Sequence, residues 1–129
     1  MKPKIDRTTL KTVTIKVGRG HKWSVDVAGE PPPTIVWAWR DSIPLSNTER
    51  ITIENRDYHT DFSIIDASRK DAGIYTLQAE NKSGKDSESV ELIVLGKLLY
   101  HLIFFNSNQP VQYISHFLLL FFLAHFDKN

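Results

Sequence analysis

Apolar and polar residues alternate along most of the first 95 residues, and this period of two restricts the fold more than any other feature of the chain. It recurs in seven short runs: Val13–Val17, Trp23–Val27, Ile35–Trp39, Ile51–Ile53, Phe62–Ile64, Tyr75–Ala79 and Val90–Val94. Such alternation predicts half-exposed β-strands, each with one face in the core. Clusters of Gly, Pro, Asn and Asp separate the runs, and none of the runs carries the stripe of an amphipathic helix. We therefore predict an all-β sandwich.

The charges of the chain nearly balance, with 16 Lys and Arg against 15 Asp and Glu and a net charge of +1. A chain without a strong overall field is not held to nucleic acid or to an anionic membrane by charge alone, so neither is a predicted partner. The absence of cysteine excludes a disulfide framework, a thiolate metal site and a cysteine nucleophile. The first residues, Met1–Lys4, lack the apolar run of a secretory signal, and we expect a cytoplasmic protein.

The character of the chain changes near Gly96. Residues 98–129 hold one Asp, one Lys and six of the seven Phe, whereas residues 1–97 hold almost all of the charges. We predict one domain over residues 3–95, followed by an apolar tail over residues 96–129 that is not a native domain.

The tail is too interrupted for a typical membrane anchor. Its longest uninterrupted apolar run, Phe117–Ala124, has eight residues, and residues 111–126 also fall short of the roughly 20 that span a bilayer. Residues spelled by AT-rich codons dominate it, and Gly96-Lys97 can be spelled with the GTAAA of a splice donor. Our hypothesis is that the chain is a fragment of a longer protein, translated from an exon into an intron.

Three motifs follow one another in the domain. Gly29–Trp37 has the sequence GEPPPTIVW, Asp71–Leu77 has the sequence DAGIYTL, and Ala79–Gly84 has the sequence AENKSG. Together they resemble the entry to strand C, the tyrosine corner and the F–G hairpin of immunoglobulin domains of the intermediate set, the I-set. The resemblance covers residues 3–95 and implies an immunoglobulin-like Greek-key β-sandwich.

The chain departs from that family at the inter-sheet disulfide, whose two cysteines would fall on Val25 and Leu77. Losing such a bridge costs about 2–5 kcal/mol, and fully burying a Val or Leu returns about 1.5–3 kcal/mol each. A sandwich without the disulfide is therefore physically tolerable. Immunoglobulin domains without cysteine resemble those of the giant intracellular muscle proteins, the titin, twitchin and projectin group.

The resemblance also implies structural roles for particular residues. Trp37 is expected to pack across Val25 and Leu77 at the centre of the sandwich. Its neighbour Trp39 is undecided, because the segment Trp37–Leu45 is about one residue longer than the family pattern.

A second group of structural residues is expected at the corner motif. The Tyr75 hydroxyl should reach the backbone upstream of Asp71, and Asp71 should pair with Arg50 and close one end of the sandwich. Gly73 belongs to the same corner.

Other patterns give no catalytic, cofactor or metal residues. His59, Asp61 and Ser63 share one strand face, but neighbours two apart on a strand are roughly 6.5–7 Å apart, too far for a relay of direct hydrogen bonds. We interpret them as a solvated polar face, and two ligands alone make no metal site. Asn81-Lys82-Ser83 matches a glycosylation sequon but also suits a hairpin. The basic residues near the N-terminus and near the F–G turn fit either an acidic partner or a solvated surface: Lys2, Lys4, Arg7 and Lys11, and Lys82 and Lys85.

We therefore predict a non-catalytic structural and protein-interaction module from a modular sarcomeric protein of the twitchin or titin type. Its expected partners are neighbouring immunoglobulin or fibronectin-type domains and muscle filament proteins, with no cofactor and no small-molecule substrate. The expected location is the myofibril in the cytoplasm. A kinase domain in a longer parent protein stays open, as does the alternative of a cell-surface adhesion domain with a C-terminal membrane anchor.

Overall fold

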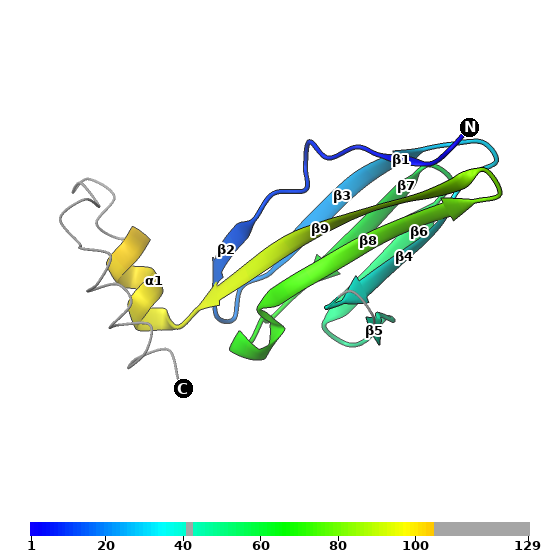
Figure 1. Ribbon diagram of the computed structural model, residues 1–129. Helices are drawn as coiled ribbons and strands as arrows, with labels where there is room; N and C mark the ends of the chain where they lie inside the picture. The colour runs from blue at the N-terminus through cyan, green and yellow to red at the C-terminus, as the bar shows by residue number, and fades with distance from the viewer. Residues whose placement is uncertain (41–42, 105–129) are drawn as a thin grey trace.

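The chain forms two β-sheets packed face to face, with a short helix beyond one end of the sandwich (Figure 1). This is a computed structural model, and it describes residues 1–40 and 43–104. The all-β two-sheet fold expected from the alternation is confirmed. In chain order the elements are β1 (Lys4–Ile5), β2 (Val13–Lys16), β3 (His21–Ala28), β4 (Thr34–Trp39), β5 (Ile43–Pro44), β6 (Ile51–Arg56), β7 (His59–Ile64), the 3-10 turn η1 (Arg69–Asp71), β8 (Gly73–Asn81), β9 (Gly84–Leu95) and α1 (Lys97–Phe104).

Each sheet combines strands from distant parts of the chain. The first sheet has the order β1–β3–β7–β6 and the second has the order β2–β9–β8–β4–β5. Within the described residues every ladder is antiparallel except β2–β9, in which Val13–Lys16 run parallel to Leu92–Leu95. The N-terminal segment therefore changes sheets, pairing with β3 through β1 and with β9 through β2 (Figure 1).

The inner faces of the two sheets form one core, and the alternation predicted most of its members. Trp23, Val25 and Val27 on β3 are each 1% exposed. Ile51 and Ile53 differ from expectation, since both are only half-buried. The reason is that β6 is an edge strand with a neighbour on one side only. The two-residue strands β1 and β5 are too short for any period to predict them.

The resemblance places the two disulfide cysteines at Val25 and Leu77, and both of these side chains are fully buried. Leu77 lies on β8 directly opposite Trp37 on β4, whereas Val25 lies on β3 directly opposite Thr60 on β7. The two apolar side chains therefore belong to opposite sheets of one core. Their burial supplies hydrophobic stabilisation where the family has a covalent bond.

Helix α1 lies within the segment that the sequence predicted to be a tail. It starts two residues after the end of β9 and packs against β2, with Leu99 only 2% exposed. The preceding residue in the chain, Leu98, is 50% exposed. Among the described residues no helix is both long and apolar enough to cross a membrane. The predicted apolar run Phe117–Ala124 lies outside the described residues.

The two neighbouring leucines of α1 allow a direct test of whether this helix contributes to the stability of the domain. We expect Leu99→Ala to lower the free energy of unfolding by about 2–5 kcal/mol, because it opens a cavity at a buried site. Leu98→Ala should change it by less than about 0.5 kcal/mol, as surface substitutions do. Urea unfolding of the full chain measures both. Equal midpoints for the two variants would contradict the burial of Leu99.

Candidate functional site

Trp37 connects the two sheets through a hydrogen bond as well as through packing. Its indole Nε1–H donates to Thr60 Oγ1 on β7 at 2.9 Å. The Thr60 hydroxyl donates in turn to Asn55 Oδ1 on β6 at 2.6 Å, and Asn55 Nδ2 donates to the Ile35 carbonyl on β4 at 3.2 Å. Thr60 is not among the residues predicted from the sequence, although extending the period of Phe62 and Ile64 back by two residues places it on the inner face.

A cluster of aromatic rings surrounds Trp37 on the inner faces of both sheets. The Trp37 ring centroid lies 4.9 Å from Phe62 and 6.4 Å from Trp23, and Phe62 lies 5.2 Å from Tyr75. Such offset and tilted pairs are favourable beyond the area that they bury. The two tryptophans differ in one respect: the indole N–H of Trp23 is buried without a hydrogen-bond partner among the described residues.

The corner residues lie at one end of the sandwich. The Tyr75 hydroxyl donates to the carbonyl of Asp71 itself at 2.7 Å, rather than to the backbone upstream of it. Both carboxylate oxygens of Asp71 accept from the Arg50 guanidinium, at 2.6 and 3.1 Å, and one also accepts from the backbone N–H of Ser68 at 2.7 Å. The pair joins the start of β6 to the turn before β8.

These contacts shift the pKa values of two corner groups. Burial works to raise the pKa of Asp71, but Arg50 and the Ser68 N–H outweigh it and hold this pKa below its ordinary value. Burial, together with the negative charge of Asp71, raises the pKa of Tyr75 to about 12. The phenol therefore remains a hydrogen-bond donor at neutral pH.

Gly73 and Trp39 are packed against each other at the same corner. Gly73 has φ +149°, and a Cβ at this position would lie 2.8 Å from Cη2 of the Trp39 ring. Trp39 is half-buried, and its ring meets Tyr75 edge-on at 4.8 Å. Trp39, whose position the sequence left undecided, therefore packs against the core.

The polar residues on the outer face of the first sheet are closer together than expected. His59 Nε2 lies 3.0 Å from Asp61 Oδ1, so the prediction that these two residues could not bond was wrong. Backbone spacing set that prediction, whereas the two side chains lean toward each other. Asp61 is also 7% exposed rather than solvated. The third member of the cluster is Ser24 on β3, whose hydroxyl donates to Asp61 Oδ1 at 2.5 Å.

The cluster does not have the arrangement of a hydrolytic triad or of a metal site. His59 Nδ1 lies 2.7 Å from Asp26 Oδ1, so both ring nitrogens face carboxylates. Asp26 and then Asp61 raise the pKa of His59, and because both ring nitrogens are occupied by carboxylates, neither is turned toward a metal position or a hydroxyl nucleophile. The described residues contain no group of three or more His, Cys, Asp or Glu that could hold a metal ion.

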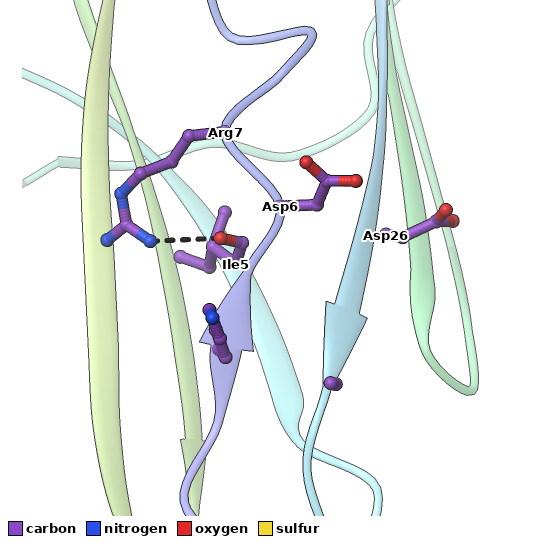
Figure 2. A pocket seen from close by; sticks show the side chains of 6 residues that line it. Ile5, Asp6, Arg7 and Asp26 are labelled. Carbon is purple, nitrogen blue, oxygen red and sulfur yellow. Dashed lines mark hydrogen bonds between the residues drawn. The ribbon is translucent and has the colours of Figure 1, made fainter.

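Arg7, one of the basic residues considered for an acidic partner, is bound within the chain. Its guanidinium donates to Asp86 at 2.8 Å and to Glu88 at 2.5 Å on β9, and to the Ile5 carbonyl at 2.9 Å. It thereby fastens the N-terminal segment to the second sheet. Figure 2 shows this side chain reaching back to Ile5, with Asp6 and Asp26 on the other side of the segment.

A groove of about 530 Å³ lies beside this segment. Its lining residues come from β1, from the segment after it and from the end of β3: Lys4, Ile5, Asp6, Arg7, Asp26 and Ala28. The charges of both signs along the groove give it no strong preference for one class of charged ligand.

Asn81, the acceptor residue of the glycosylation sequon, has its side chain fully engaged. Nδ2 donates to the carbonyls of Met1 and Pro31 at 2.9 and 3.0 Å, and Oδ1 accepts from the Ser83 N–H at 2.8 Å. Its amide therefore joins the N-terminus, the turn before β4 and the β8–β9 hairpin. A glycan on Nδ2 would replace one of its two N–H donors and so remove at least one of these contacts.

The model of one family, the immunoglobulin I-set domain, matches residues 3–94. The chain belongs to the immunoglobulin I-set family. Fast-type myosin-binding protein C of Mus musculus is 33% identical over 89 residues, 69% of this chain and 8% of that protein. The striated muscle preferentially expressed protein kinase of Danio rerio is 30% identical over 92 residues, 71% of this chain and 3% of that protein. The chain thus spans a small part of the length of these relatives.

Solved structures show the same similarity. The titin M3 domain is 30% identical, with a TM-score of 0.64 over 72% of this chain and 96% of that chain. The complex of titin M10 with an immunoglobulin domain of obscurin-like 1 contains a chain that is 26% identical, with a TM-score of 0.67 over 74% of this chain and 95% of that chain. The I-set domain described here is therefore related to domains of sarcomeric giant proteins, and the family match includes no catalytic domain.

The two core tryptophans should respond to the same substitution by different amounts. Trp37→Phe removes a donor from the buried Thr60 hydroxyl, whereas Trp23→Phe removes a buried N–H that has no partner in the described structure. We expect Trp37→Phe to destabilise the I-set domain more than Trp23→Phe by about 1–3 kcal/mol. Both lose similar apolar volume, so each serves as the control of the other. Equal urea midpoints would contradict a stabilising Trp37–Thr60 bond.

The corner predicts an acid-dependent loss of stability. At neutral pH we expect Asp71→Asn to cost about 1–3 kcal/mol, a figure reduced because the Arg50 side chain is 39% exposed. A carboxyl with a lowered pKa stabilises the fold above its unfolded pKa of about 3.9 and loses this effect as the pH falls through its folded pKa. The difference between wild type and variant should therefore shrink below about pH 4. Glu80→Gln, which alters the exposed pair with Lys85, is the control and should be near neutral.

Proposed function

We propose that this I-set domain is a non-catalytic structural and protein-interaction module of a longer sarcomeric protein, with residues 3–95 as the module. Neighbouring immunoglobulin or fibronectin-type domains and filament proteins would be its partners in the myofibril. The relatives support this setting, since myosin-binding protein C and titin are muscle proteins. In the solved complexes, titin domains are paired with obscurin-like 1 and with telethonin, which supports protein surfaces as the partner class.

The geometry that carries the proposal is the parallel pairing of β2 with β9. β2 lies near the N-terminus, β9 is the last strand, and they run side by side in the same direction. A pull on the two ends of the domain therefore moves them in opposite directions along their common axis. The hydrogen bonds between Val13–Lys16 and Leu92–Leu95 are then loaded together in shear rather than opened one by one. Such a module suits a chain that transmits tension between filament components.

A module of an array gains its attachment from several linked domains. Single contacts of modest affinity become strong when neighbours raise the effective concentration. The side chains of the core and corner supply rigidity to this arrangement, and exposed polar residues on β6 and β9 are available to partners. No reacting group is needed for such a role.

The proposal predicts where the native protein lies in the cell. An antibody raised against the I-set domain should label striated bands along the myofibrils in muscle sections of the source organism. Pre-absorption of the antibody with the purified chain is the control and should abolish the bands. Labelling of the surface of unpermeabilised cells, with a glycan on Asn81, would overturn the proposal in favour of an adhesion protein.

A further inference from the structure

His59 is held on two sides by carboxylates that come from different places in the sequence. It lies on β7 directly opposite Asp26 on β3, and Asp61 follows it on the same face of β7. The distances are 2.7 Å from Nδ1 to Asp26 Oδ1 and 3.0 Å from Nε2 to Asp61 Oδ1. The ring therefore bridges the central ladder of the first sheet.

The charged groups around this ring come from every strand that flanks it. Arg56 on β6 lies opposite His59 and donates from Nη2 to Asp61 Oδ2 at 3.2 Å. The other charged residues of the face lie in the neighbouring rows of the sheet and on the N-terminal segment: Lys22 on β3, Glu54 on β6, and Lys4 and Asp6 beside the groove that Asp26 lines. Among these groups, the carboxylates of Asp26 and Asp61 are the ones that form hydrogen bonds with the ring.

Both contacts can be favourable only when the ring carries two protons. An ionised carboxylate accepts hydrogen bonds and cannot donate one, so each ring nitrogen needs its own N–H. The neutral ring has a single N–H, and its other nitrogen would turn a lone pair toward a carboxylate. The His59 side chain is 27% exposed, so protons from solvent can reach it.

We propose that His59 is a proton-operated clamp between β3 and β7. In its doubly protonated form the ring binds Asp26 and Asp61 at the same time and ties the two strands together on the outer face. When it loses one proton, one of the two contacts becomes repulsive and the clamp opens. The strength of the first sheet then varies with pH in the range near neutrality, where histidine titrates.

The sign of the effect follows from proton linkage. A histidine whose pKa is raised on folding stabilises the fold below its unfolded pKa of about 6.5, and this effect is lost as the pH rises through the folded pKa. Acidification toward about pH 6 therefore tightens the clamp, and alkaline pH releases it. The ion pair of Arg50 and Asp71 depends on pH in the opposite direction, because its stabilisation is lost on acidification, and it does so only in a more acidic range.

The same ladder supplies a matched control. His21 also lies on β3, opposite Ile64 at the other end of the β3–β7 ladder, but its ring packs edge-on against Trp23 instead of a carboxylate. Burial lowers the pKa of His21, so its protonation opposes folding. The two histidines should therefore respond to pH in opposite directions.

The test uses the full chain and two readouts, ring NMR titration and urea unfolding between about pH 6 and pH 8.5. Ring signals are assigned with His59→Gln and His21→Gln. We expect His59 to titrate above about 6.5 and His21 below it. The urea midpoint of the wild type should exceed that of His59→Gln by a margin that shrinks as the pH rises. For His21→Gln the corresponding margin should grow.

Asp26→Asn adds a test that leaves the histidine in place. Removing the charge opposite Nδ1 should lower the pKa of His59 toward its ordinary value, and this readout survives even if His59→Gln proves unstable. The proposal is overturned if His59 titrates at or below about 6.5 in the wild type. It is also overturned if the difference in urea midpoint between the wild type and His59→Gln is constant across the pH range. An unchanged His59 titration in Asp26→Asn would also overturn it.

Discussion

The sandwich depends on how its two sheets are held together without a covalent bond. Trp37 lies in the same buried core as Val25 and Leu77, and its N–H starts a chain of hydrogen bonds through Thr60 and Asn55. That chain runs from β4 to β7, on to β6, and back to the backbone of β4. The Trp37–Thr60 bond lies inside the apolar core, where a satisfied polar contact favours one specific packing, and Asn55 continues the chain on the exposed edge strand β6. None of these groups is sensitive to reduction, which suits a domain that contains no cysteine.

Much of this arrangement follows from the sequence, because a period of two assigns each residue of a strand to one face. The alternation located the core strands, and the motifs located Trp37, Tyr75 and Asp71. Thr60 escaped because a polar residue on an inner face looks like an exposed one until its partner is known. The contact of His59 with Asp61 escaped for another reason. It depends on the reach and direction of two side chains, whereas the sequence gives only the spacing of their backbones.

Contacts between segments far apart in the chain were the other features that could not be predicted from the sequence. Asp26 and Ser24 join the polar cluster because β3 pairs with β7, a register that no local pattern specifies. Arg7 resembled a free surface charge, yet the approach of the N-terminal segment to β9 supplies it with Asp86 and Glu88. The corner was more predictable, since its motif already contains Asp71, Gly73 and Tyr75 within a few residues. Local motifs thus predicted local geometry, whereas the contacts made by pairing between distant strands could not be predicted from them.

The pairing of β2 with β9 also bears on how the domain is made. Its register joins Val13 to Leu92, so one of the first strands to leave the ribosome finds its neighbour only when the last strand emerges. Until then the edge of β2 has no permanent partner, and such non-local closure is slow compared with the formation of local hairpins. In the tandem array proposed above, the edge of β2 in a nascent domain would meanwhile be exposed to the last strand of the domain before it. Differences in sequence between adjacent modules would then protect the growing polypeptide from pairing with the wrong neighbour.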